Sequence, residues 1–132
     1  MDQEPLVREE IDAARKFLDE LAKRLPVAAA FWLKPDEGSW ELYVATDRVK
    51  EGLGPVYDVI GEVAAAIDDP NFDLFRVKLI APRHPLARAA REVYQRRPSE
   101  IPVYIRGGFF GGIWADGVYL YPPPAPALSR SK

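Results

Sequence analysis

The chain has 132 residues, of which 48% are hydrophobic and 29% charged, and its formal net charge at pH 7 is −2. These values are typical of one soluble globular domain and exclude an intrinsically disordered chain. The sequence holds no cysteine, which excludes disulfides and thiolate chemistry and favours a reducing, cytoplasmic compartment. No stretch approaches the roughly 18 to 20 apolar residues that a membrane span needs, so we expect no membrane partner.

The first helix and the first two strands are predicted by the N-terminal third of the sequence. Apolar residues from Leu6 to Leu25 recur every three or four positions, which predicts a helix that Pro26 ends. Residues 27–33 and 40–46 have the composition and alternation of strands. The turn-forming residues 35–39 between them predict a hairpin.

The middle of the chain predicts two more helices with a strand between them. Pro55 opens a helix whose buried stripe reaches Ile67, after which an Asp-Asp-Pro-Asn segment ends it. Residues 74–80 alternate as a strand, with Phe75 expected on the same face as Val77 and Leu79. A third helix is expected from Pro85 to about Arg97, bounded by prolines.

The C-terminal part predicts a meander of strands near residues 101–106, 109–115 and 118–121. Gly107-Gly108 and Asp116-Gly117 are dipeptides suited to type I′ turns, and Gly111-Gly112 inside the middle strand indicates a bulge. The order α-β-β-α-β-α-β-β-β predicts an α+β fold with a mixed sheet of about five to six strands backed by helices. We expect a single domain over residues 1–121 and a flexible proline-rich tail over 122–132.

Charge is unevenly distributed along this order of elements. Residues 1–75 hold 8 lysines and arginines against 17 acidic residues, whereas residues 76–106 hold 8 against 2. Such segregation indicates an anion-facing surface or electrostatic pairing with a partner. The simpler alternative is that folding interleaves the two halves and dilutes the contrast.

Catalytic constellations are scarce in the sequence. His84 is the only histidine, which excludes a histidine-rich metal site within one chain, and its position before a proline fits a helix start. No serine lies in a Gly-x-Ser-x-Gly elbow, and the glycines of 107–112 lack the Lys-Ser/Thr of a phosphate loop. A small metal-dependent hydrolase would need Asp47, Asp58 and Glu62 to converge on Mg²⁺. A solvated helix face is the simpler interpretation, so we expect no cofactor, no metal and no catalytic site.

Basic and aromatic residues of the second half are the candidate binding residues. Arginines lie on the side of the third helix opposite its apolar residues, and strand residues of alternate parity can present cations and a tyrosine away from the helices. Arginine and tyrosine are enriched at protein interfaces, and single-strand nucleic-acid binders use similar sheet faces. The candidate residues are Arg76, Lys78, Arg88, Arg91, Tyr104 and Arg106.

The sequence therefore favours a non-enzymatic module that binds a protein partner or a second copy of itself through an aromatic and arginine surface. Single-stranded nucleic-acid binding through the same residues is the alternative. The acidic isoelectric point near 5.5 argues against it. The metal-dependent hydrolase is the third and least favoured hypothesis.

Overall fold

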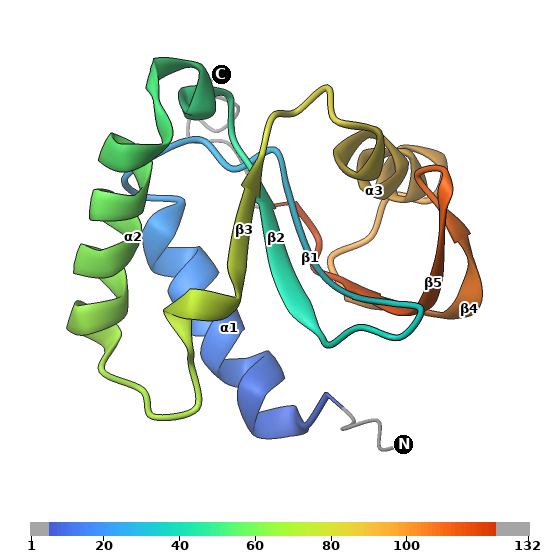
Figure 1. The fold of residues 1–132 in the computed structure, drawn as a ribbon, viewed down its shortest axis with the longest axis horizontal. Helices are drawn as coiled ribbons and strands as arrows, with labels where there is room; N and C mark the ends of the chain where they lie inside the picture. Colours follow the sequence, from blue (N-terminus) through green and yellow to red (C-terminus); the bar gives the residue numbers. More distant parts are fainter. Residues whose placement is uncertain (1–5, 124–132) are drawn as a thin grey trace.

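The fold has three layers, in which two helices, a mixed sheet and a third helix follow one another (Figure 1). The computed structural model describes residues 6–123, so residues 124–132 of the expected tail lie outside the described part. The helices are α1 (Arg8–Leu21), α2 (Leu53–Ile67) and α3 (Pro85–Arg96), with short 3-10 helices η1 (Asp47–Glu51) and η2 (Leu74–Arg76). The strands are β1 (Ala29–Pro35), β2 (Glu41–Ala45), β3 (Val77–Ile80), β4 (Val103–Phe110) and β5 (Ile113–Leu120). This arrangement confirms the expected α+β class.

The sheet has the strand order β3-β2-β1-β5-β4. β1 pairs antiparallel with both β2 and β5, and β5 pairs antiparallel with β4. β3 lies parallel to β2, because the connection through α2 runs from the end of β2 back to the level at which β2 begins. β1 is therefore the central strand, and six of its seven residues are buried.

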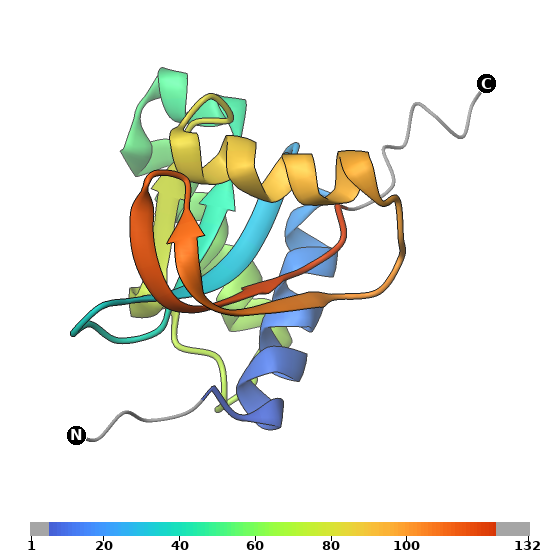
Figure 2. The same cartoon turned by 90° about the vertical axis from the view of Figure 1, so that its right-hand side faces the viewer.

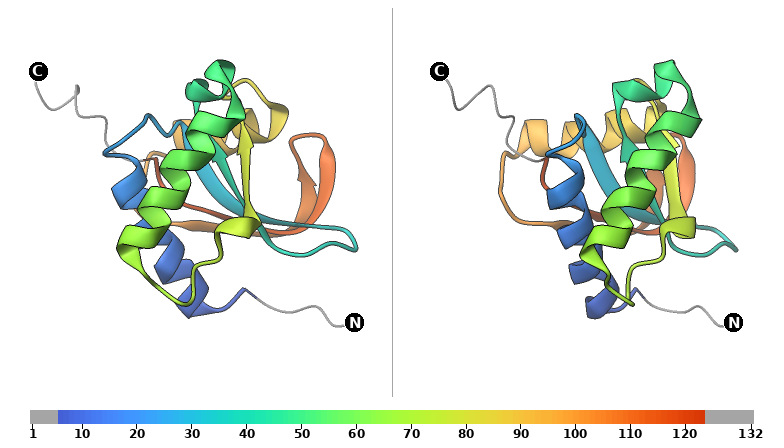
Figure 3. Two further views of the ribbon diagram at one scale, coloured as in Figure 1. Left: turned by 60° about the vertical axis from the view of Figure 1, so that its left-hand side comes forward. Right: turned by 90° about the vertical axis from the view of Figure 1, so that its left-hand side faces the viewer.

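Helices cover both faces of the sheet. α1 and α2 pack on one face, as Figure 3 shows, and α3 packs on the other, as Figure 2 shows. The core under α1 and α2 contains Phe17, Leu21, Leu42, Val44 and Ile60, and the core under α3 contains Phe31, Leu33, Leu86, Val118 and Leu120. No helix among residues 6–123 is long and apolar enough to cross a membrane.

Charge is separated between these layers. α1 and α2 together carry seven carboxylates against three cations, whereas α3 carries three arginines against one glutamate. The sheet therefore separates the charged residues of the helices, although Arg76 and Lys78 of the basic segment pair with Glu10 and Glu41 of the acidic one.

The C-terminal segment forms one long hairpin instead of the expected three-stranded meander. Gly111 and Gly112, with φ of +60° and +91°, make the turn where a bulge was expected. The two expected turns, Gly107-Gly108 and Asp116-Gly117, lie opposite each other inside β4 and β5. The register of β5 against β1 shifts at this point, so a bulge occurs where a turn was expected. All three dipeptides suit a type I′ turn, and packing of the hairpin end beneath α3 selects one of them.

The third strand is also shorter than expected. The Asp73 side chain accepts a hydrogen bond from the Phe75 N–H at 2.9 Å, and Leu74–Arg76 forms η2, so β3 begins only at Val77. This local hydrogen bond replaces strand pairing. The expectation that Phe75 faces the helices with Val77 is therefore wrong, since Phe75 is 86% exposed.

Candidate functional site

The six candidate binding residues do not form one surface. Tyr104 and Arg106 lie on the edge strand β4, and Lys78 lies on β3 at the opposite edge of the sheet. Arg76 belongs to η2. Arg88 and Arg91 lie on α3, which covers the face of the sheet opposite α1 and α2. Tyr104 and Arg106 are neighbours, because alternate residues of a strand share one side. Arg88 and Arg91 are also neighbours, because they lie three residues apart on α3.

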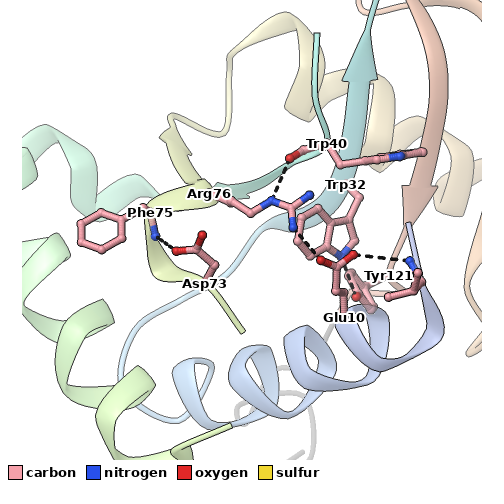
Figure 4. Close-up of polar contacts among 8 residues, drawn as sticks. Glu10, Trp32, Trp40, Asp73, Phe75, Arg76 and Tyr121 are labelled. Atoms are coloured by element: carbon pink, nitrogen blue, oxygen red, sulfur yellow. Dashed lines mark hydrogen bonds and ion pairs between the residues drawn. The ribbon is translucent and has the colours of Figure 1, made fainter. Parts of the chain in front are cut away.

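Arg76 connects three elements inside the molecule (Figure 4). Its Nη1 donates to Glu10 Oε2 at 2.7 Å, and its Nε donates to the Trp40 carbonyl oxygen at 3.2 Å. The guanidinium carbon lies 5.1 Å from the ring centre of Trp32, within the range of a cation–π interaction. Lys78 also has a partner, since its Nζ lies 3.7 Å from a carboxylate oxygen of Glu41. Both cations thus contact carboxylates of their own chain.

The polar residues considered for catalysis in the sequence analysis do not converge on one centre. Asp47, Asp58 and Glu62 are all exposed, and Glu62 accepts a hydrogen bond from Arg24 at 2.6 Å. Across residues 6–123, no three His, Cys, Asp or Glu side chains form a group that could hold a metal ion. His84 caps α3, because its Nδ1 accepts the Leu86 N–H at 3.0 Å. The hydrolase hypothesis thus has no geometry to support it.

Aromatic side chains gather on the side of the β4–β5 hairpin that faces away from α3. Phe109 and Trp114 are 78% and 47% exposed, and their rings pack edge to face with centres 5.5 Å apart. Tyr104 is 54% exposed, and its ring centre lies 6.5 Å from that of Tyr119. The name aromatic strip is used below for this group: Trp40, Tyr104, Arg106, Phe109, Trp114 and Tyr119.

Gly117 allows Trp40 and Tyr104 to lie directly on the backbone of the hairpin. A Cβ at Gly117 would lie 2.8 Å from Cη2 of Trp40 and 3.2 Å from the Tyr104 hydroxyl oxygen. A Cβ at Gly107 would lie 3.8 Å from Cζ2 of Trp114. The absence of a side chain at Gly117 therefore makes room for the Tyr104 end of the strip, whereas a Cβ at Gly107 would make an ordinary contact with Trp114.

A hollow of about 300 Å³ opens at the Tyr104 end of the aromatic strip. Its walls are Tyr104, Tyr119 and Trp40 from the sheet side, with Ile11 of α1 and Leu6, which precedes that helix. All five side chains are predominantly apolar. The hollow therefore suits an apolar side chain of a binding partner.

An ion pair holds Trp114 in the strip. The Lys34 side chain is only 8% exposed, and its Nζ lies 3.0 Å from Asp116 Oδ2. The other carboxylate oxygen, Oδ1, accepts a hydrogen bond from Trp114 Nε1 at 3.3 Å. Because the hydrogen bond from Lys34 stabilises the ionised carboxylate, the pKa of Asp116 is lowered. The indole is thereby tied to the interior of the sheet.

We predict that Asp116→Asn destabilises the protein near pH 7 and that this difference disappears in acid. A carboxyl group with a lowered folded-state pKa contributes stability above its unfolded pKa, which is 3.8. That contribution is lost as the pH falls through the folded-state value. Urea unfolding midpoints of the two proteins should be compared near pH 7 and about pH 2.5. Equal differences at both pH values would contradict the assignment.

Comparison with known proteins finds no matching family model, no similar curated protein and no similar solved structure. The geometry of the site is therefore the basis for assigning a function.

Sequence reasoning named two members of the aromatic strip as candidate binding residues and did not predict the contact between Phe109 and Trp114. Tyr104 and Arg106 are among the candidates, whereas Phe109 and Trp114 both fall in the predicted middle strand of the meander, where they cannot face each other. The signal that could have found them is the Gly111-Gly112 dipeptide, because a turn there puts Phe109 directly opposite Trp114.

Proposed function

We propose that the chain is a non-enzymatic protein-recognition module whose contact surface is the aromatic strip. One observation carries the proposal: Tyr104, Phe109 and Trp114 remain exposed, although the opposite side of the same hairpin packs into the core beneath α3. Exposed groups of large apolar side chains mark interaction sites, and aromatic residues with arginine are enriched at the centre of protein interfaces. A protein partner, or a second copy of the chain, would bury them.

The rigidity of the hairpin supports this function. Phe110 and Ala115 pack in the core beneath α3, and the Lys34–Asp116 pair fixes the indole of Trp114. A surface that is already ordered loses little conformational entropy when it binds. We also propose the cytoplasm as the compartment in which the module works, since a chain without cysteine suits reducing conditions.

The test compares proteins captured by the immobilised chain with those captured by the double variant Phe109→Ala/Trp114→Ala. Truncation of a central interface aromatic weakens binding by about 2 kcal/mol or more, which is roughly 30-fold. We therefore expect the double variant to lose the captured protein. Phe75→Ala is the matched control, because Phe75 is an exposed aromatic residue outside the aromatic strip. Circular dichroism verifies that each variant is folded.

Capture that is the same for all three proteins, or no capture and no self-association by the wild type, would reject the proposal. A parallel titration with single-stranded oligonucleotides tests the second candidate function. Exposed Arg88 and Arg91 favour it, since neither pairs with a carboxylate within residues 6–123. However, they lie across the sheet from the strip, whereas single-strand binders stack bases and contact phosphates along one groove. Oligonucleotide binding that weakens steeply with salt would favour this candidate instead.

A further inference from the structure

The two edges of the sheet differ in how open they are to strand pairing. β3 has four residues, one of which is a lysine, and Pro82 follows shortly after it. Short strands, lysine and proline are common protections of a sheet edge. β4 has eight residues and contains neither lysine nor proline, although Pro102 directly precedes it. Within the described part of the chain, β4 pairs with β5 alone. β4 is therefore the edge at which another strand can add.

The hydrogen bonds of β5 determine which groups of β4 face outward. The Tyr121 N–H donates to the Ala30 carbonyl oxygen at 3.1 Å, across the junction of β5 and β1. Backbone groups of successive strand residues point alternately to the two neighbouring strands. At this end of β5, Leu120 and Val118 therefore direct their backbone groups to β4.

The backbone groups of β4 that face outward are therefore those of two members of the aromatic strip. The residues opposite Leu120 and Val118 are Val103 and Ile105, which consequently bond to β5. Tyr104 and Arg106 alternate with them and direct their N–H and C=O groups away from the sheet.

This edge is self-complementary in one register. In an antiparallel pair centred on Ile105, Tyr104 of one copy lies opposite Arg106 of the second copy, and each such pair exchanges two backbone hydrogen bonds. The two side chains share one face, so the guanidinium can lie against the phenol ring. In a pair centred on Arg106 instead, the two copies of Arg106 would lie opposite each other, and their like charges would repel. Centring on Tyr104 would oppose Arg106 to Pro102, which has no N–H.

We propose that two copies of the chain pair through β4, antiparallel about a two-fold axis at Ile105, to form one continuous sheet. This inference rests on the proposed function and names the partner at the Tyr104 end of the aromatic strip as a second copy. The symmetry brings the two aromatic strips onto the same side of the joint sheet. Gly107 has a φ of +46°, which is not extended backbone, so regular pairing ends near it and involves only a few residues. We therefore expect a dissociation constant in the micromolar range.

The first test measures the molar mass of the wild type by light scattering between about 1 μM and 1 mM. Mass is expected to rise from monomer to dimer over this range. Arg106→Ala keeps the backbone donor and loses the cation–π contact, which weakens pairing about tenfold because the contact occurs twice. Arg106→Pro also removes the outward N–H and should stay monomeric, while edge strands tolerate proline at such a position. Arg88→Ala is the control, since Arg88 is an exposed arginine off the edge.

The second test is amide hydrogen exchange of the wild type, which needs no variant to fold. Val103 and Ile105 amides should be protected at every concentration, whereas Tyr104 and Arg106 amides should gain protection only as dimer forms. A monomer throughout the range would overturn the inference, as would a dimer in which those two amides stay unprotected. Monomeric wild type that captures another protein through Trp114 would reject the second copy and leave the proposed function standing. Failure of both pairing and capture would reject both.

Discussion

Gly111→Ala will destabilise the protein by about 3 kcal/mol, because it combines backbone strain with a steric overlap. Gly111 has a φ of +60°, which a side chain makes unfavourable. An added Cβ would lie 2.8 Å from Cδ2 of Leu86 and 2.9 Å from its Cα. Leu86 belongs to the first turn of α3 and is buried, so it has no room to move away. Urea unfolding near pH 7 measures the loss.

Gly112→Ala is the matched control for this effect. Gly112 also has a positive φ, at +91°, but no atom lies within 4 Å of the position that a Cβ would take. Only strain remains, and we expect a loss of about 1 kcal/mol. Equal losses for the two variants would show that the hairpin turn does not press against α3.

Arg76→Ala will destabilise the protein by about 2 kcal/mol, because Arg76 makes charge-assisted hydrogen bonds in a partly buried site. The variant loses the contacts to the Glu10 carboxylate and the Trp40 carbonyl, as well as packing over Trp32. Arg76→Lys keeps the charge but lacks a planar group that can reach both acceptors, so it should recover only part of the loss.

The control for Arg76 is Lys78→Ala on the neighbouring strand. Lys78 is half exposed and its ion pair with Glu41 spans 3.7 Å, so we expect a change below about 0.5 kcal/mol. Unfolding midpoints of the three variants and the wild type decide the matter. An equal loss of stability for Arg76→Ala and Lys78→Ala would show that the contacts of Arg76 do not stabilise the fold.

Periodicity predicted the helices and the first hairpin correctly because burial on one face repeats at the helical or strand spacing. Leu18 and Leu21 lie on the buried face of α1, and Leu42 and Val44 alternate with partly exposed residues in β2. Residues 29–33 of β1 form a continuous apolar run, which is typical of a strand covered on both faces. These signals are local, so the sequence alone carries them.

Residue spacing could not predict the site, because the decisive contacts join distant segments. Phe109 and Trp114 share one face only after the turn is placed at Gly111, and that choice depends on packing against Leu86. The sequence pattern predicts Arg76 as an exposed cation of a strand, whereas in the structure its side chain contacts Glu10 of α1. The strand residues around Arg76 and Tyr104 also face different helical layers, since Val77 packs under α1 and α2 whereas Val103 packs under α3.

The separation of carboxylates and arginines across the sheet gives the molecule an electric dipole along the direction in which its layers stack. A net charge of −2 understates the resulting field. Near an acidic macromolecule the molecule will turn α3 toward it, and near a basic one it will turn α1 and α2. This steering reaches only about 8 Å at physiological ionic strength. Added salt should therefore slow encounters with charged partners while leaving short-range aromatic contacts almost unchanged.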